Sequence, residues 1–340
     1  MHKLLLIILL ILITKISLAQ FAPAVGEAGT TAIYKDSSII VSWANECYVN
    51  RGYLNIEDTN YTLINGQDTT NKAYFGENSF ALGKPNGNLN VVSLGDGGYA
   101  ILKFNNPIKN GQGFDFAVFE NGFKASENNY FLELAFVEVS SNGINFIRFP
   151  SQSLTQDTTQ IDGFGYLNPA KFNNLAGKYV NDYGTPFDLD DIKDSANINI
   201  DSIVYVKIID VIGDINNNYC SWDSYGHKIN DPFPTPFASG GFDLNGIGVI
   251  NQQKSNITQK SNNKLIVYPN PCSNKIYISY NNNINNIKIY NYLGKIIVSK
   301  NFNKKNIILN TDILTPNIYF LKISTQNKTF VKKIIKTATN

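Results

Sequence analysis

Residues 91–149 read VVSLGDGGYAILKFNNPIKNGQGFDFAVFENGFKASENNYFLELAFVEVSSNGINFIRF, and this stretch decides the fold. Short apolar runs at 100–104 and 114–119 are separated by a glycine-rich break, and residues 132–140 alternate between apolar and polar side chains. Asn142-Gly143, just before the next apolar run, is a β-hairpin signal. Period-two alternation with these breaks predicts an antiparallel sheet with one buried face.

The rest of the body continues this pattern. Apolar runs at 203–211 and 242–250 predict further strands, whereas residues 150–198 and 213–241 are rich in turn residues and predict loops. No stretch carries a sustained 3.6-residue apolar period. We therefore predict an all-β chain whose residues 20–250 form a jelly-roll-like β-sandwich.

The N-terminus has the pattern of an export signal. Lys3 precedes a short apolar run at 4–13, and Ser17-Leu18-Ala19 is a small-x-small cleavage site. This predicts a signal peptide at 1–19, with an uncleaved anchor as the alternative. No later stretch is long and apolar enough to predict a transmembrane helix.

The C-terminal part differs in composition from the body. The polar stretch 251–263 predicts a flexible linker, and residues 264–340 return to short alternating strands typical of a small Ig-like β-sandwich. Those residues carry twelve lysines and one acid, Asp312, which leaves the other residues a net charge of −9. An acidic exported body favours cation binding and disfavours nucleic-acid binding, which needs a basic face.

Residues 264–340 resemble the C-terminal sorting domain of the type IX secretion system of Bacteroidota. The resemblance rests on Val267-Tyr268-Pro269-Asn270-Pro271, on IYNYLGK at 289–295, on LTPNIYFLKI at 314–323, and on KKIIK at 332–336. It implies that the type IX machinery is a partner, and that the protein is delivered through the periplasm to the outer cell surface or released.

The body is similar to a group of bacterial cell-surface proteins. The similarity covers SLGDGGYAILKF at 93–104, NGQGFDFAVFENGF at 110–123, AFVEVSSNGINFIRFPS at 135–151, GTPFDL at 184–189 and INDPFPTPFASGGFDLNGIGVI at 229–250. The piece VEVSSNGINF also resembles a hairpin of discoidin-like and carbohydrate-binding jelly rolls. The first resemblance implies a surface location, both imply a β-sandwich, and the second one adds glycan binding as an expectation.

The chain has three cysteines. In an exported protein two of them can pair, and we predict a disulfide between Cys47 and Cys220 because Cys272 lies in the C-terminal part. Three buried free thiols are the alternative.

Acidic residues recur near the ends of the predicted strands. They are Asp115, Glu120, Glu133, Glu138, Asp188, Asp210, Asp223, Asp231 and Asp243. Carboxylates can act as caps and turns, bind Ca²⁺, or serve in pairs about 5–10 Å apart in glycoside hydrolysis. For a calcium site we predict Glu120, Asp210 and Asp243 as ligands, because each lies near a strand end.

Other chemistry is restricted by what the sequence lacks. His227 is the one histidine after the predicted signal peptide, which excludes a His-rich zinc site and leaves nucleophilic catalysis dependent on that residue. No phosphate-binding or dinucleotide fingerprint occurs.

The loop at 213–241 carries four aromatic residues that we predict as ligand contacts. They are Trp222, Tyr225, Phe233 and Phe237. Loop aromatics can stack on a sugar or other flat ligand, or they can close the end of a sandwich. We therefore expect an exported binding protein for a glycan or small nutrient, stabilised by Ca²⁺. A hydrolase with paired carboxylates and a structural or adhesive surface protein are the alternatives.

Overall fold

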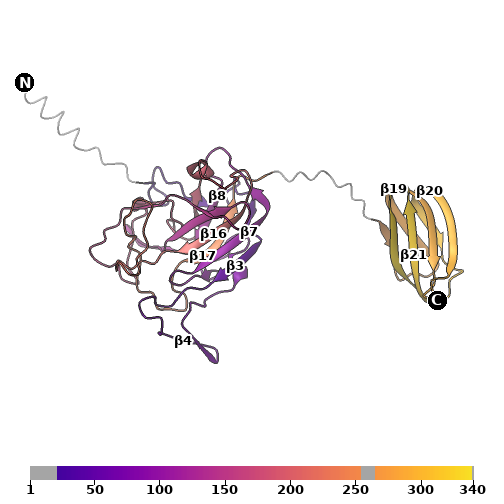
Figure 1. Cartoon of the computed structure of the whole chain (residues 1–340), viewed down its shortest axis with the longest axis horizontal. Coiled ribbons are helices and arrows are strands. Elements are labelled where there is room, and N and C mark those ends of the chain that lie inside the picture. The colour runs from indigo at the N-terminus through magenta and orange to yellow at the C-terminus, as the bar shows by residue number, and fades with distance from the viewer. Residues whose placement is uncertain (1–20, 254–264, 339–340) are drawn as a thin grey trace, which may run out of the picture. The chain divides into compact units, whose positions relative to one another are not determined.

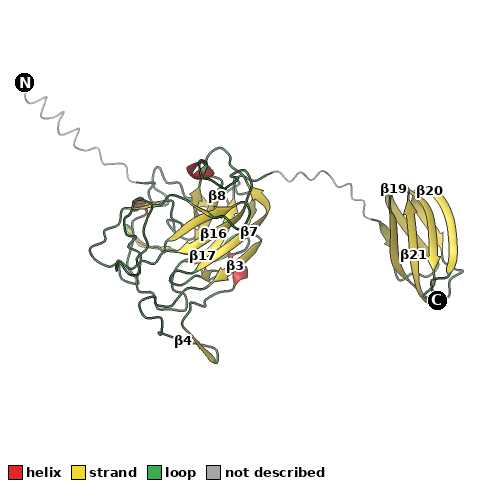
Figure 2. Cartoon of the chain, in the orientation of Figure 1, coloured by secondary structure: helices red, strands yellow, loops and turns green. Residues whose placement is uncertain are grey.

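The computed structural model describes residues 21–253 and 265–338, and the chain divides into two compact units between residues 254 and 255 (Figure 1). We call the described residues 21–253 the body. Strands dominate both units, and the helical elements among the described residues are the 3₁₀ turns η1 (Asn78–Ala81), η2 (Pro169–Lys171) and η3 (Leu189–Ile192) (Figure 2). The predicted all-β fold class is confirmed. The predicted signal peptide and most of the predicted linker lie outside the described residues.

The body contains two antiparallel sheets. The first has the order β1 (Ile33–Tyr34), β15 (Tyr183–Phe187), β8 (Phe116–Glu120), β17 (Asp243–Val249), β2 (Ser42–Trp43), with β6 (Val92–Ser93) also paired to β17. The second has the order β12 (Ile147–Arg148), β11 (Ala135–Ser140), β16 (Ile203–Asp210), β7 (Tyr99–Ile108), β3 (Glu46–Asn50).

One hydrophobic core joins the two sheets. Phe116 and Val118 of β8 belong to the same buried cluster as Leu102 of β7 and Val206 of β16. Along the chain, β8, β11, β15, β16 and β17 alternate between the sheets, so their connections cross the sandwich as in a jelly roll. Burying side chains of this size contributes roughly 1.5–3 kcal/mol each.

The predicted hairpin at Asn142-Gly143 is confirmed. Strands β11 and β12 pair antiparallel with Glu138 opposite Arg148, and Gly143 has a φ of +76°. The expectation of one buried face was wrong for β11. Val137 faces the main core, while Phe136 belongs to a second buried cluster with Leu132 and Leu134. Long loops cover the outer face of this sheet, so both sides of β11 are buried.

The body also contains three two-stranded ladders that are separate from the two main sheets. They are β4 (Leu63–Asn65) with β5 (Asp68–Thr70), β9 (Phe123–Ser126) with β10 (Asn129–Phe131), and β13 (Gln152–Ser153) with β14 (Phe172–Asn173). The β9–β10 hairpin follows β8 directly, which places it at the end of the first sheet.

The C-terminal unit is a single five-stranded arrangement around its own core. Its strands are β18 (Ile266–Tyr268), β19 (Lys275–Tyr290), β20 (Ile296–Asn310), β21 (Asn317–Thr325) and β22 (Thr329–Lys336). Strand β19 pairs with β20 along its length, with β18 near its start and with β21 near its end. Irregular register after Ser279 moves the buried positions from Ile276 and Ile278 to Ile287 and Ile289.

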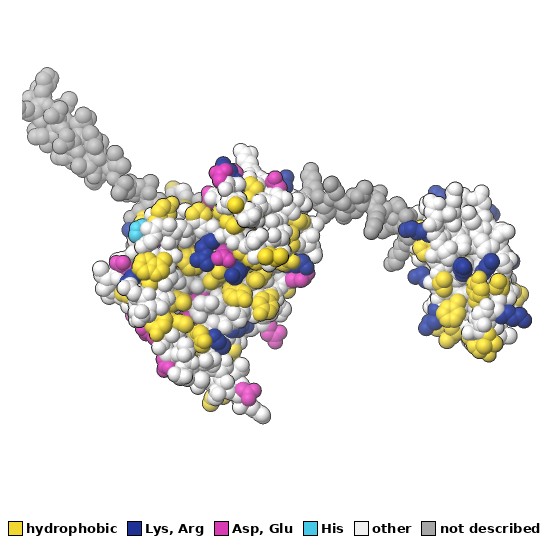
Figure 3. Space-filling view, viewed as in Figure 1, with side chains coloured by type: hydrophobic (Ala, Val, Ile, Leu, Met, Phe, Trp, Pro, Cys, Tyr) yellow, Lys and Arg dark blue, Asp and Glu magenta, His cyan; other side chains and the backbone are white. Residues whose placement is uncertain are grey.

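The two units differ in surface charge. On the face shown in Figure 3 the lysines of the C-terminal unit stand without acidic neighbours, whereas acidic side chains are visible on the body. Among the residues that the structure describes, no helix has the length and apolar character needed to cross a membrane.

Candidate functional site

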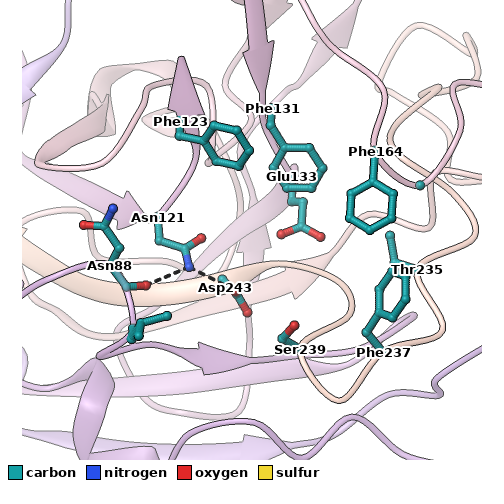
Figure 4. Close-up of a pocket in the computed structure, with 12 residues that line it drawn as sticks. Asn88, Asn121, Phe123, Phe131, Glu133, Phe164, Thr235, Phe237, Ser239 and Asp243 are labelled. Carbon is teal, nitrogen blue, oxygen red and sulfur yellow. Dashed lines mark hydrogen bonds between the residues drawn. The ribbon is translucent and has the colours of Figure 1, made fainter. Parts of the chain in front are cut away.

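A pocket of about 320 Å³ opens at one end of the first sheet (Figure 4). Glu120 at the end of β8 lies opposite Leu244 near the start of β17, so Asn121 and Asp243 reach the same edge. The β9–β10 hairpin and three loops complete the walls. The lining residues are Asn88, Leu89, Asn121, Phe123, Phe131, Glu133, Gly163, Phe164, Thr235, Phe237, Ser239 and Asp243.

Two pairs of phenylalanines form aromatic walls of this pocket. Phe123 and Phe131 are stacked across the β9–β10 hairpin, with ring centroids 5.2 Å apart and an interplanar angle of 20°. Phe164 and Phe237 come from separate loops, and their ring centroids are 5.4 Å apart. Phe123, Phe164 and Phe237 are more than one-third exposed, so their rings are open to a ligand.

Two carboxyl groups lie between these aromatic pairs. Asp243 accepts hydrogen bonds from the Ser93 hydroxyl and from Asn121 Nδ2, the latter at 3.0 Å. Glu133 is only 5% exposed, and no described residue donates a hydrogen bond to its carboxyl group. Figure 4 shows both of its oxygens directed into the pocket. Its oxygens face the pocket and have no protein donor, so Glu133 is a marked feature of this site.

Burial raises the pKa of both pocket acids. The pKa of Glu133 lies well above its ordinary value because of burial first, and then because of the charges of Asp243, Glu120 and Asp231. Burial also raises the pKa of Asp243 to about 7, although hydrogen bonds from Ser93 and Asn121 and the charge of Arg51 oppose the rise. Both shifts favour the neutral form of the two carboxyl groups.

Further buried acids behind the pocket hold the backbone of its loops. Asp210 accepts hydrogen bonds from Gly97 N at 3.0 Å and Phe242 N at 2.7 Å. Glu120 accepts one from Gly122 N at 2.7 Å, and Asp231 accepts one from Leu134 N at 3.0 Å. Each acid fixes a residue next to a pocket segment, so these groups support the shape of the site.

Comparison with known proteins identifies the second unit. Residues 266–337 match a family model described as a secretion system C-terminal sorting domain, and the match spans β18 to β22. The C-terminal unit is a sorting domain of the type IX secretion system. Its resemblance in sequence is thereby confirmed. The sorting domain indicates export to the outer cell surface or secretion, with the type IX machinery as its partner.

Two solved structures are distantly similar to parts of the chain. One is PorZ, an essential surface component of the type IX secretion system of Porphyromonas gingivalis, at 12% identity and a TM-score of 0.20, covering 27% of this chain and 14% of PorZ. The other is the BSP domain of a biofilm associated protein, at 8% identity and a TM-score of 0.17, covering 70% of this chain and 48% of that one. No curated protein matches the chain. The pocket must therefore be interpreted from its own geometry.

The three predicted calcium ligands are engaged by donors of the protein itself. Glu120, Asp210 and Asp243 each bind different backbone or side-chain donors, as described above. Within residues 21–253 and 265–338, no group of three or more His, Cys, Asp or Glu side chains is arranged to hold a metal ion. Calcium binding by the body remains a prediction.

A thermal melt tests that prediction directly. A ligand that binds only the native state at a hundredfold excess over its Kd adds about 2.7 kcal/mol of stability. The calcium hypothesis therefore predicts a higher Tm with excess Ca²⁺ than with EDTA. Identical melting curves under the two conditions would contradict calcium binding by the body.

The four predicted aromatic contacts are found in different environments. Phe237 lines the pocket. Phe233 is 3% exposed and packs in the interior, whereas Trp222 and Tyr225 are 48% and 65% exposed and lie outside the pocket lining. The loop at 213–241 thus contributes one of the predicted aromatic residues to the pocket, together with Thr235 and Ser239.

The predicted disulfide between Cys47 and Cys220 is not formed, because all three cysteines are free. Cys47 lies on β3 opposite Leu102 and packs against the core, and burial raises its pKa to about 12. Cys220 lies in a turn in which its backbone N–H donates to the Asn216 carbonyl. This placement of the thiols corrects the expectation from the sequence.

His227 is held by an acid of its own loop. Its Nδ1 lies 3.0 Å from Asp223 Oδ2, and its backbone N–H donates to the same carboxylate. Burial would raise the pKa of Asp223, but hydrogen bonds from Ser153, His227 and Tyr225 bring it below its ordinary value. This arrangement gives Asp223 and His227 a role in loop structure.

Several pocket residues were not among the predicted site residues. Phe123, Phe131 and Phe164 belong to segments that read as strand or loop without a binding motif. Glu133 was noted among the acids near strand ends, but its position between Leu132 and Leu134 in an alternating segment predicts only that it faces the side opposite to them. Nothing in the sequence alone indicates that this side is enclosed.

Proposed function

We propose that the protein is an exported surface protein whose body binds a small glycan or nutrient molecule in the aromatic pocket. The observation that carries the proposal is the unpartnered, buried Glu133 carboxyl group between two phenylalanine pairs. Small-molecule sites are typically concave, largely apolar and supplied with a few directed polar groups. The volume of about 320 Å³ is at the lower end of the range for such sites, which is about 300–1,000 Å³.

A second candidate is hydrolysis of a glycoside by Glu133 and Asp243. Such chemistry needs one protonated and one ionised carboxyl group, and burial raises the pKa of both groups here, which favours the protonated one. The geometry favours binding over hydrolysis, because Asp243 is already engaged by Ser93 and Asn121. Product analysis of any bound glycan would separate the two candidates.

The test of the proposed function is a comparison of two aromatic variants. Screening the purified full-length protein against glycans and small polar nutrients by thermal shift is expected to give at least one ligand. Phe237→Ala removes one aromatic side chain of the pocket wall. It is expected to lower the affinity for that ligand about tenfold, because roughly 1–1.5 kcal/mol of contact with the ring is lost.

Tyr225→Ala provides the matched control, because it removes a more exposed ring of the same loop that does not line the pocket. We expect its Kd to equal that of the unaltered protein. A ligand that loses affinity in Tyr225→Ala but not in Phe237→Ala would move the binding site to the exposed part of the loop. That result would contradict the assignment of the pocket.

A further inference from the structure

We propose that the pocket selects a ligand that carries an organic ammonium group, bound between the Glu133 carboxylate and the phenylalanine rings. This inference rests on the proposed function and specifies the chemical class of its ligand. It follows from the unsatisfied carboxyl group, the aromatic walls and the excess of acids around them.

The first argument is the missing partner of Glu133. Its side chain is almost fully buried, and its chain neighbours Leu132 and Leu134 anchor the segment in a hydrophobic cluster. None of the described residues donates a hydrogen bond to it, yet its oxygens face the cavity (Figure 4). A positively charged donor on a ligand would supply both the hydrogen bond and the counter-charge that the protein does not provide.

The second argument is the chemistry of the walls. Phe123, Phe131, Phe164 and Phe237 offer ring faces but no hydroxyl or indole N–H groups to bind the hydroxyls of a sugar. A cation within about 6 Å of a ring centroid is attracted by the ring quadrupole, and a water-poor site strengthens this attraction. Aromatic rings around a carboxylate therefore match an alkylated ammonium group, while Asn88, Asn121, Thr235 and Ser239 can bind hydroxyl groups of the same ligand.

The third argument is the charge around Glu133. Asp243 on β17, Glu120 on β8, Asp210 on β16 and Asp231 in the 213–241 loop all act on it electrostatically. A ligand cation would relieve the repulsion within this group.

The nearby basic side chains are engaged elsewhere. Arg51 acts on Asp243, but its guanidinium donates to the carbonyl oxygens of Phe75 and Ser93. Lys178 follows Gly177, which packs on the Glu133 backbone, but its ammonium group donates to the Phe172 carbonyl at 2.7 Å. Neither side chain hydrogen-bonds the Glu133 carboxyl group.

This arrangement couples binding to proton release. Burial raises the pKa of Glu133, and an incoming ammonium group beside its oxygens favours the carboxylate. A proton released from this carboxyl group passes to bulk water, while the ligand keeps its own charge and all its atoms. By linkage, affinity rises with pH by up to about tenfold per pH unit in the range where the empty pocket is protonated.

The experiment uses the full-length protein and calorimetry between pH 5 and pH 8. Choline and glucosamine are the quaternary and primary ammonium probes, and 3,3-dimethylbutan-1-ol and glucose are their neutral counterparts. We expect at least one ammonium probe to bind about tenfold or more tightly than its neutral counterpart. The pH series uses choline, whose charge does not change, and its affinity is expected to rise with pH.

Glu133→Gln and Glu127→Gln form the matched pair of variants. Both remove one carboxyl group, but Glu127 is exposed in the turn of the β9–β10 hairpin and does not line the pocket. Glu133→Gln is expected to weaken the ammonium probe at least about tenfold and to reduce the pH dependence, because Asp243 still titrates in the pocket, while Glu127→Gln leaves both unchanged. The pH series on the unaltered protein tests the proposal even if Glu133→Gln fails to fold.

Three results would overturn the inference. The first is equal or tighter binding of the neutral counterparts, and the second is an affinity for choline that does not change with pH. The third is a rise in Tm with Ca²⁺ alone that is lost in Glu133→Gln, which would make the pocket a metal site. A neutral ligand that is lost in Phe237→Ala would overturn the ammonium inference but support the proposed function. Absence of any ligand in the screen would contradict the proposed function itself.

Discussion

Replacing Gly177 by alanine is expected to destabilise the body by at least about 4 kcal/mol, which is a large part of the stability of a typical domain. Gly177 has a φ of +80°, and a Cβ atom there would lie 1.8 Å from the Glu133 carbonyl oxygen and 3.1 Å from the Phe242 ring. Backbone atoms cannot rotate away as a flexible side chain can. The adjacent Ala176 also exchanges two backbone hydrogen bonds with Ala135, which would resist any shift of the segment.

Gly226→Ala separates the steric effect from the backbone conformation. Gly226 has nearly the same φ of +81°, but nothing lies within 4 Å of a Cβ atom built there. Its substitution is expected to cost only about 1–2 kcal/mol, the ordinary cost of a left-handed backbone. Urea unfolding followed by tryptophan fluorescence measures the stability of both variants. Trp43 and Trp222, the two tryptophans of the chain, lie in the body and report its unfolding. Equal decreases in the free energy of unfolding in the two variants would contradict the tight contact at Gly177.

The stability of the body is expected to fall as the pH rises from about 4 to 7. Burial raises the pKa of Asp96 and Asp243 to about 7 and that of Asp115 to about 6. In the unfolded chain the same groups titrate near pH 4. Between these values the folded state binds more protons than the unfolded state, so the free energy of unfolding decreases with pH.

We expect the body to be at least about 3 kcal/mol more stable at pH 5 than at pH 7, since one such group contributes about 1.4 kcal/mol per pH unit. Burial lowers the pKa of Lys178 to about 7, so this lysine adds stability only as the pH rises above that value. Between pH 5 and pH 7 the change in the free energy of unfolding therefore comes from the acids. Urea unfolding at several pH values measures the change, and a body more stable at pH 7 than at pH 5 would contradict the burial of these acids in neutral form.

The main strands of the fold could be predicted from the sequence because they depend on local patterns. The alternation around β11 and β16 and the Asn142-Gly143 turn specify paired strands over short distances. The second buried face of β11 could not be predicted in the same way. It arises where Leu167 and Phe172, far along the chain in a loop-rich segment, pack on Phe136.

The candidate site was less predictable, because it is assembled from distant segments. Phe164 and Phe237 are 73 positions apart in the printed sequence but contact each other. The sequence contains many acids, and nothing in it marks Glu133 as the one that faces the pocket without a partner. Asp210 and Glu133 look alike in the sequence, but the first is satisfied by Gly97 and Phe242 while the second faces an open cavity. Only the three-dimensional partners distinguish them.

The C-terminal unit shows the opposite case. Its short motifs, including Val267-Tyr268-Pro269-Asn270-Pro271, were sufficient to predict the sorting domain that the family match at 266–337 confirms. The predicted disulfide shows the limit of such reasoning, since the separate positions of Cys47 and Cys220 depend on the path of the chain between them.

The most direct test of the binding pocket is a crystal structure of the protein with the tightest ligand from the screen. The account predicts ligand density among Phe123, Phe131, Phe164 and Phe237, with a polar or charged ligand atom within hydrogen-bond distance of the Glu133 carboxyl group. Density at Trp222 and Tyr225, with the pocket empty and Glu133 still unpartnered, would contradict it.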